Sequence, residues 1–252
     1  MNGTPIIEVS NLVRRFGDRT VLKDISFQVD RGETLVIMGG SGCGKSTLLR
    51  HIIGSMKPTS GSVKIFGEEI TAMNEREIEA VRKRFGMLFQ SGALLASLTV
   101  GENVALPLEQ HSGKAPDVIE GIVEEKLKLV GLSGFENLKP AEISGGMKKR
   151  VGLARALALD PEIVFLDEPT AGLDPISASQ FDELVGGLQR SLNLTVVMVT
   201  HDIDTLRATT DRIAVLVDKK LKVGTIGTLV HDPHPWIQDY FAGARGRAAL
   251  NA

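Results

Sequence analysis

A glycine-rich stretch followed by lysine and serine is the part of the sequence best suited to binding phosphate. Residues 39–46 read GGSGCGKS and match the pattern G-x-x-x-x-G-K-[ST]. An apolar run at residues 34–38 precedes them, and a segment of helical period begins near Lys45, which is the context that the pattern requires. Glycines let backbone N–H groups turn toward phosphate oxygens, and the helix N-terminus adds a positive dipole end. We therefore predict a phosphate-binding loop for a nucleotide.

Within this loop, two side chains are expected to contact the nucleotide phosphates and its metal ion. Lys45 is expected to bridge the β- and γ-phosphates, and the Ser46 hydroxyl is expected to bind Mg²⁺. Cys43 is interpreted as a small filler, since the sequence places no catalytic base near it. The residues of this segment expected to contact the nucleotide are Gly39, Gly40, Ser41, Gly42, Cys43, Gly44, Lys45, Ser46 and Thr47.

Two carboxylates end a second apolar run, at residues 163–168 with the sequence IVFLDE. In a parallel sheet this strand end lies beside the phosphate loop, where Asp167 can hold Mg²⁺ through water. Glu168 would then act as the general base toward the attacking water. Because neighbouring side chains of a strand point to opposite sides, the two carboxylates are expected to have different roles.

Three histidines need separate interpretations. His201 directly follows the predicted strand 195–199 and would face the nucleotide crevice, within reach of the γ-phosphate and the water. A lone histidine is more often structural, and only its position favours the catalytic role. His231 and His234 resemble a spaced metal pair, but the sequence HDPHP breaks any helix and no third ligand is close, so no metal site is expected there.

The patterns around these residues predict an α/β fold. Near-continuous apolar runs at residues 34–38, 163–166, 195–199 and 213–217 alternate with helical segments, which indicates a mainly parallel core sheet covered on both faces. Residues 6–9, 21–29 and 62–66 instead alternate apolar and polar positions, as in an antiparallel sheet with one solvated face.

Between residues 91 and 160 the pattern predicts helices and no strand. Residues 117–130 and 144–159 have helical spacing, so an α-helical subdomain is inserted into the core. We expect one domain over 5–242, with 5–90 and 161–230 forming the core and its antiparallel β-subdomain, and 91–160 forming the helical subdomain. Residues 243–252 are expected to be a flexible tail.

Composition excludes several classes of protein. The chain has 252 residues, a formal net charge of −2, 24% charged residues and a single cysteine. No apolar stretch approaches the roughly 20 residues of a membrane span, and the first ten residues do not read as a secretory signal. We expect a cytoplasmic protein without intrachain disulfides and without nucleic-acid binding. The basic clusters 82–84 and 148–150 are interpreted as solvated faces.

A further motif makes the pattern specific. Residues 143–147 read ISGGM, and over residues 5–242 the sequence resembles the nucleotide-binding subunit of ABC transporters, which has a P-loop NTPase fold. The resemblance implies that Ser144, Gly145 and Gly146 close over the γ-phosphate held by the opposite subunit of a head-to-tail homodimer. From the residues alone, Ser144 is equally an ordinary N-cap of the helix that follows.

The same resemblance assigns three more positions. Phe16 matches the aromatic residue that stacks on adenine, and Gln90 matches the residue that contacts Mg²⁺ and the attacking water. Asp174 matches the acidic member of the loop that crosses the dimer interface. Met147 and Ala171 depart from the usual Gln and Ser, without removing a catalytic group.

A narrower resemblance involves residues 85–107, together with SGGMKKR and DEPTAGLDPI. These segments look like the ATPase of MCE-domain lipid transport systems of the Mla type. That implies ATP hydrolysis, with ATP and Mg²⁺, driving transport of phospholipid or another lipid between bacterial membranes. The implied partners are a permease dimer, an MCE-domain lipid-binding protein and in some systems a STAS-domain protein. The implied location is the cytoplasmic face of the inner membrane, through the permease.

Several alternatives stay open at this point. The chain fits an importer or exporter ATPase of the same family with another substrate, or a soluble ABC ATPase that acts without a permease. A P-loop kinase or GTPase does not account for residues 144–146 and His201. Residues 93–95 fit either a docking groove for a permease helix or a core-facing loop. Trp236 and Tyr240 fit either a partner contact or ordinary helix packing.

Overall fold

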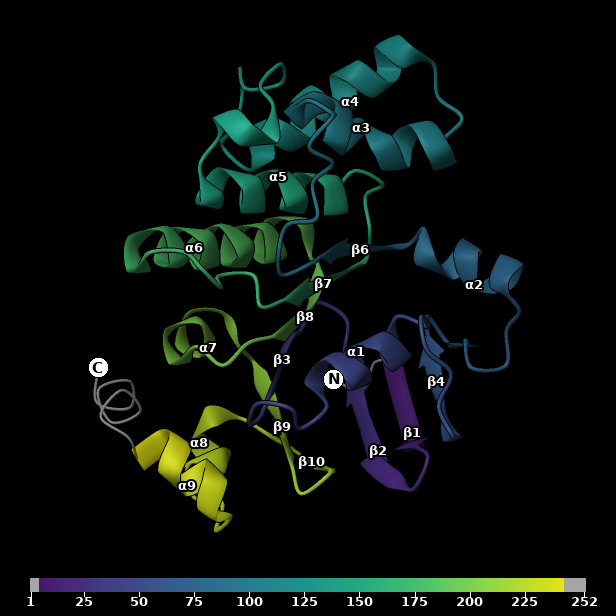
Figure 1. Ribbon diagram of the computed structural model, residues 1–252, viewed down its shortest axis with the longest axis vertical. Coiled ribbons are helices and arrows are strands. Elements are labelled where there is room, and N and C mark those ends of the chain that lie inside the picture. The colour runs from purple at the N-terminus through teal and green to yellow at the C-terminus, as the bar shows by residue number, and fades with distance from the viewer. Residues whose placement is uncertain (1–4, 243–252) are drawn as a thin grey trace. The chain divides into compact units, whose positions relative to one another are not determined.

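The computed structural model describes residues 5–242, which divide into two compact units whose elements are labelled in Figure 1. The first unit combines the residues up to Val81 with those from Val197 onward, and the second unit is Arg82–Val196. Helices occur with both antiparallel and parallel strand pairs, so the predicted α/β class is confirmed. Among the described residues, no helix combines the length and apolarity of a membrane span.

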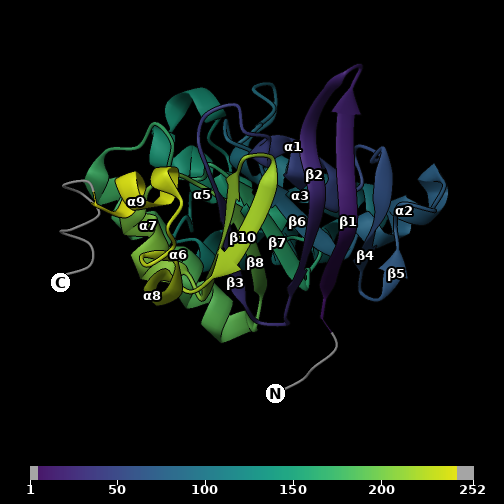
Figure 2. The ribbon, with the colours of Figure 1, turned by 90° about the horizontal axis from the view of Figure 1, so that it is seen from below.

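An antiparallel sheet forms the N-terminal part of the first unit, as predicted. Its strand order is β2-β1-β4-β5, with β1 Ile7–Phe16, β2 Arg19–Val29, β4 Ser60–Ile65 and β5 Glu68–Glu69. Figure 2 shows β1 and β2 running side by side as a long hairpin. Along the second half of β2, exposed polar positions alternate with buried apolar ones, because one face of the sheet meets solvent.

Strand β1 is longer than the predicted strand 6–9. Its pairing with β2 shifts register between Val9 and Leu12, and Asn11 there has a positive φ of 49°. Such a bulge adds a residue and breaks the alternation of buried and exposed positions. The pattern therefore ends at Val9, although the strand continues to Phe16, where a site residue was predicted.

The remaining strands of the first unit are buried. Strand β3 Thr34–Met38 has only buried side chains and pairs in parallel with β9 Arg212–Val217. Strand β9 also pairs with β10 Lys220–Gly224 in an antiparallel hairpin that was not predicted. Strand β8 Thr195–Val199, also fully buried, passes from the second unit into the first. The associated helices are α1 Lys45–Ile52, α2 Glu75–Arg82, α7 Ile203–Thr209, α8 Ile226–Leu229 and α9 Pro235–Ala242.

The second unit contains the predicted run of helices. Strand β6 Phe85–Leu88 pairs in parallel with β7 Ile163–Asp167. In the part of the chain that is described, only helical elements lie between residues 91 and 160. The helices of this unit are α3 Val100–His111, α4 Pro116–Leu129, a 3₁₀ turn at Pro140–Glu142, α5 Gly145–Ala156 and α6 Pro175–Leu192.

Helix α3 is a difference from the prediction, which contains no helix there. Pro107 lies inside it, and a proline is normally a sign that a helix ends. A capping box compensates at the start, because the Thr99 hydroxyl accepts from the Glu102 N–H while the Glu102 carboxylate accepts from the Thr99 N–H. The interior then packs against α4 and α5, so tertiary contacts outweigh local propensity.

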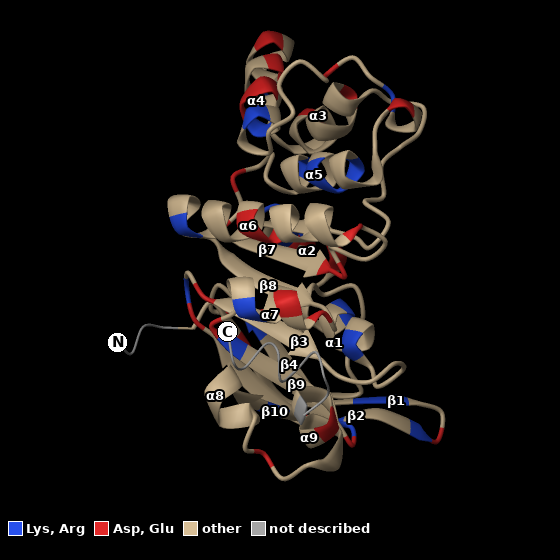
Figure 3. Cartoon of the chain, turned by 90° about the vertical axis from the view of Figure 1, so that its left-hand side faces the viewer, with Lys and Arg blue, Asp and Glu red and all other residues tan. Residues whose placement is uncertain are grey.

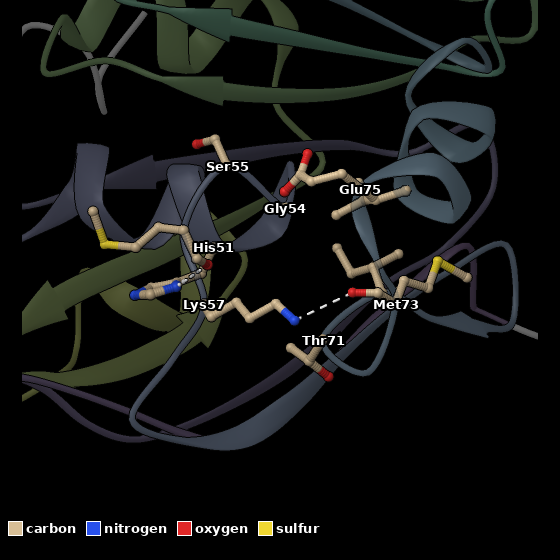
Figure 4. A pocket seen from close by; sticks show the side chains of 10 residues that line it. His51, Gly54, Ser55, Lys57, Thr71, Met73 and Glu75 are labelled. Atoms are coloured by element: carbon tan, nitrogen blue, oxygen red, sulfur yellow. Dashed lines mark hydrogen bonds between the residues drawn. The ribbon is translucent and has the colours of Figure 1, made fainter.

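Helix α1 carries an unusually buried histidine. His51 is 1% exposed, and its Nδ1 lies 2.7 Å from the Met56 carbonyl oxygen. Among the described residues, its Nε2 has no hydrogen-bond partner. Figure 4 shows the adjoining cavity of about 70 Å³, across which Lys57 donates to the Met73 carbonyl oxygen. Burial, and then repulsion from Arg14, lower the pKa of His51 below its ordinary value.

We predict that His51 makes stability sensitive to mild acid. Because its pKa is lower in the folded state, the unfolded chain binds the proton first, so stability is lost as pH falls below about 6.5. The loss is at most about 1.4 kcal/mol per pH unit from this one group. In His51→Gln this contribution should disappear, so its melting temperature should fall less than that of the wild type between pH 7.5 and 5.5. The exposed His111→Gln is the control, and parallel curves for His51→Gln and wild type would refute the prediction.

Candidate functional site

The loop between β3 and α1 can exist only with glycine at two of its positions. Gly39 has φ of 150°, and a Cβ there would lie 2.5 Å from the Leu216 carbonyl oxygen and 2.8 Å from Cys43 Sγ. Gly44 has φ of 114°, and a Cβ there would lie 2.9 Å from a methyl group of Val21. The first and last constant glycines of the motif are therefore required by close packing and by a backbone that L-residues rarely adopt.

Lysine and the start of α1 give this loop its positive character. The Lys45 ammonium donates to the carbonyl oxygens of Gly39 and Gly40, at 2.8 and 3.3 Å, and so is held above the loop. Gly44 is the N-cap of α1 and has no side chain to cap the first turn. The helix therefore offers N–H groups and its positive dipole end to an anion.

Cys43 fits the interpretation as a filler. Its Sγ occupies the space beside Gly39, and burial raises the pKa of the thiol above its ordinary value. A thiol that stays protonated is a poor nucleophile.

An open cleft of about 380 Å³ lies beside the loop in the same unit. It is lined by Phe16, Arg19, Val21, Gly42, Gly44, Lys45, Ser46 and Thr47. Phe16 ends β1 and is 46% exposed, so its ring is available for stacking. The Arg14 guanidinium lies 4.3 Å from the centre of that ring, a cation–π contact that orients it. The structure thus brings Phe16, Lys45, Ser46 and Thr47 to one cleft.

His201 lies in the first unit, between β8 and α7. It is exposed, and its backbone carbonyl accepts from the Tyr240 hydroxyl at 2.8 Å. His234, by contrast, has a structural task. The Trp236 N–H donates to its Nδ1 at 3.2 Å, while its Nε2 faces Asp218 Oδ2 at 3.1 Å. Both ring nitrogens are therefore engaged at the start of α9.

The two carboxylates at the end of β7 belong to the second unit. Asp167 is the last residue of the strand, and Glu168 has a positive φ of 47°. A left-handed conformation is uncommon for glutamate and is typical of functional sites. The predicted reason for their different directions, alternation along a strand, is therefore wrong, since the chain has already turned at Glu168.

A buried lysine behind these carboxylates corrects another prediction. Lys149 of α5 is 6% exposed, so the cluster 148–150 is not a fully solvated face. Its ammonium donates to the carbonyl oxygen of Gln90 and, at 3.4 Å, to that of Glu168. Burial lowers the pKa of Lys149 below its ordinary value, although the charges of Glu168 and Asp167 oppose the shift.

Arg155, six residues further along α5, adds to this arrangement. Its guanidinium donates to the carbonyl oxygens of Gly92 and Ala93, at 2.7 and 2.8 Å. The loop that begins at Gln90 is therefore held at three carbonyl groups by two cations of one helix, whose basic residues are blue in Figure 3. The sequence contained a sign that Lys149 is buried. Lys149 shares a helical face with Gly152 and Ala156, and small residues on a helical face are typical of close packing.

In the other predicted basic cluster, Arg84 forms an ion pair with Glu162 at 2.8 Å. Both side chains are partly exposed, so this pair contributes little to stability.

Helix caps define the last part of the site. The Ser144 hydroxyl accepts from the Met147 N–H at 3.2 Å and caps α5. Asp174 caps α6, accepting from the N–H groups of Ile176 and Ser177 and from the Ser177 hydroxyl at 2.6 Å. These hydrogen bonds lower the pKa of Asp174 below its ordinary value, and the bond from the Ser177 hydroxyl has the largest effect. Ser144, Gly146 and Ser177 line one cleft of about 260 Å³, so the starts of α5 and α6 meet.

Comparison with known proteins identifies the family. Residues 22–171 match the family model described as ABC transporter. The intermembrane phospholipid transport system ATP-binding protein MlaF of Haemophilus influenzae is 43% identical over 216 residues, which cover 86% of this chain and 82% of that protein. The probable ribonucleotide transport ATP-binding protein mkl of Mycobacterium leprae is 40% identical over 240 residues, 95% of this chain and 69% of that protein.

A solved structure supports the same assignment. The dimeric, post-hydrolysis state of the ATP-binding cassette MJ0796, bound to ADP and Pi, has a TM-score of 0.79 to this chain at 34% identity, covering 87% of this chain and 98% of that one. The glycine-rich loop between β3 and α1, a family match over more than half of the sequence and this likeness agree. The chain belongs to the ABC transporter family, as one of its ATP-hydrolysing cassettes.

Proposed function

We propose that this protein is the ATPase subunit of a system that transports phospholipid between bacterial membranes. The likeness to MlaF over most of both chains carries the proposal, together with the phosphate loop. The relative named for ribonucleotide transport makes a different substrate the alternative, and an ABC ATPase without a permease is the second alternative.

In this proposal the first unit binds the nucleotide. Phe16 stacks on adenine, the N–H groups of residues 39–44 surround the phosphates, and Lys45 bridges the β- and γ-phosphates. Thr47 lies in the same cleft. His201 holds the γ-phosphate and orients the attacking water.

The proposed metal is Mg²⁺, held by Ser46, Gln90 and Asp167. A hydroxyl, an amide and a carboxylate are hard oxygen donors, which is the ligand chemistry that Mg²⁺ prefers. When bound, the ion would neutralise charge on the phosphates. Glu168 deprotonates and orients the water.

The second cleft is proposed to serve the opposite subunit of a homodimer. Ser144, Gly145 and Gly146 would reach the γ-phosphate bound by the partner copy, and Asp174 would order the loop that crosses the interface. In the described chain, the capped start of α5 supports this, because its N–H groups and dipole favour an anion. Residues 5–90 and 161–230 then form the nucleotide-binding core, and 91–160 the helical subdomain.

The proposed partners are a permease dimer, an MCE-domain lipid-binding protein and in some systems a STAS-domain protein. The ATPase would lie at the cytoplasmic face of the inner membrane, bound through the permease. ATP-driven closure of the dimer would pull the permease into another state, and hydrolysis would reset it.

Replacing the proposed base tests the reaction. Glu168→Gln removes the proton acceptor but keeps the shape, so ATP binding should persist while steady-state hydrolysis falls by about 100-fold or more. The stalled protein should accumulate as an ATP-bound dimer in size-exclusion chromatography. Glu183→Gln, an exposed position of α6, is the matched control. Normal turnover in Glu168→Gln would exclude the assignment of the base.

Lys149 is proposed to position Gln90 and Glu168. In Lys149→Met both carbonyl groups lose a buried donor, and we predict a fall in kcat of about fivefold or more with little change in the KM for ATP. Little change in KM is expected because the proposed contacts with adenine and the phosphates come from Phe16, residues 39–44 and Lys45, whereas Lys149 bonds to the carbonyl groups of Gln90 and Glu168. Lys149→Gln, which restores a donor, should recover part of the rate, and Lys148→Met is the neighbouring control. An equal loss in both Lys149 variants and in the control would contradict a positioning role.

The substrate class is tested by what binds to the stalled protein. Membranes are solubilised with Glu168→Gln and ATP, and the proteins that co-purify are identified. A permease together with an MCE-domain protein supports phospholipid transport. A permease without an MCE-domain protein favours another substrate, and a soluble partner alone overturns the transport function.

A further inference from the structure

Helix α9 packs against other elements of the first unit, to which it belongs. Ile237 and Phe241 are buried on one side of it. Asp232 anchors the segment just before the helix. Its carboxylate forms an ion pair with Lys222 of β10 at 2.7 Å and accepts from the His234 N–H at 2.8 Å. Its carbonyl oxygen accepts from the Gln238 side-chain amide at 2.7 Å. A helix with anchors along its whole length has little freedom to shift.

Trp236 places one side of this helix against the phosphate loop. A Cβ added at Gly40 would lie 3.4 Å from the indole Nε1, so the edge of the indole borders the loop backbone. The indole also stacks on the Tyr240 ring, with centroids 5.2 Å apart and an interplanar angle of 20°. Trp236 and Tyr240 are four residues apart and therefore share one face of the helix.

Tyr240 connects the same face to the histidine loop. Its hydroxyl donates to the His201 carbonyl oxygen at 2.8 Å. The Tyr240 ring is held from a second side by Phe241, at 5.4 Å and 87°. One helix thus contacts both segments of the first unit that the proposed function places on the phosphates, residues 39–46 and His201.

We propose that α9 is a positioning element of the ATPase site, with Tyr240 acting through His201 and Trp236 through Gly40. The inference rests on the proposed function, since it needs His201 to act on the γ-phosphate. The hydrogen bond from Tyr240 restrains the backbone of His201. Because Tyr240 stacks on Trp236, which borders Gly40, the positions of the phosphate loop and of His201 are linked through these two rings. Hydrolysis depends on the geometry of these groups, whereas ATP binding depends mainly on the loop itself.

The first test removes a single oxygen atom. Tyr240→Phe keeps the stacked ring but removes the hydrogen bond to the His201 carbonyl oxygen, so kcat for ATP hydrolysis should fall about three- to tenfold. The KM for ATP should stay within about twofold, and the melting temperature should be unchanged within about 2 °C. Asp239→Ala, an exposed position on the same helix, should leave all three quantities as in the wild type.

A double mutant separates positioning from general damage. If Tyr240 acts through His201, Tyr240→Phe has no further effect on the residual rate of His201→Ala, measured as single-turnover cleavage of labelled ATP. Independent, multiplicative losses would overturn the inference. So would an unchanged kcat in Tyr240→Phe. A wild-type protein that hydrolyses no ATP would instead overturn the proposed function.

The second test uses Trp236, the only tryptophan of the chain. Because its indole borders the phosphate loop, its fluorescence should change on titration with ATP, and the change should saturate at the dissociation constant found by calorimetry. Lys45→Ala, which lacks the ammonium proposed to hold the phosphates, should show no such change at the same concentrations. Constant emission while calorimetry reports binding would overturn the contact between α9 and the loop.

Discussion

Binding a highly charged triphosphate through backbone amides requires a loop in which side chains are absent from the places where the chain turns. Gly39 and Gly44 satisfy that constraint, and they do so against neighbours that leave no room for a Cβ. The strand before the loop is buried along its whole length, and the helix after it starts without a side-chain cap. The cleft beside this loop, which is proposed to hold the nucleotide, is also lined by Phe16 and Thr47.

The second unit is organised differently, around cations that bind carbonyl groups. Lys149 and Arg155 of α5 both donate to carbonyl groups of the loop that begins at Gln90, and Lys149 also donates to the carbonyl oxygen of Glu168. A buried ammonium is costly unless it is well bonded, so this geometry tolerates little movement. The same helix is capped by Ser144, which lines the cleft proposed to meet the partner copy's nucleotide. A movement of α5 would therefore shift both Ser144 and the groups bonded to Lys149. Such a movement would couple the proposed dimer contact to the proposed catalytic carboxylate of Glu168.

Helix α9 gives the first unit a comparable connection. Its aromatic face contacts the phosphate loop at one turn and the carbonyl of His201 at the next. In both units, backbone carbonyl groups of the loops proposed to act in catalysis accept hydrogen bonds from side chains of a neighbouring helix.

The sequence by itself determined the phosphate loop, the buried apolar strands at residues 34–38, 163–166, 195–199 and 213–217, the helical insertion and the cap at Ser144. These features follow from local patterns of glycine, apolar period and capping residues. It did not show that Lys149 is buried, that β1 continues through a bulge to Phe16, that α3 forms despite Pro107, or that Tyr240 bonds to His201. Each of these depends on a partner far away in the chain, such as Gln90 for Lys149. Only the folded structure brings such groups together, because packing and burial, rather than local propensity, decide where a charged or strained residue is stable.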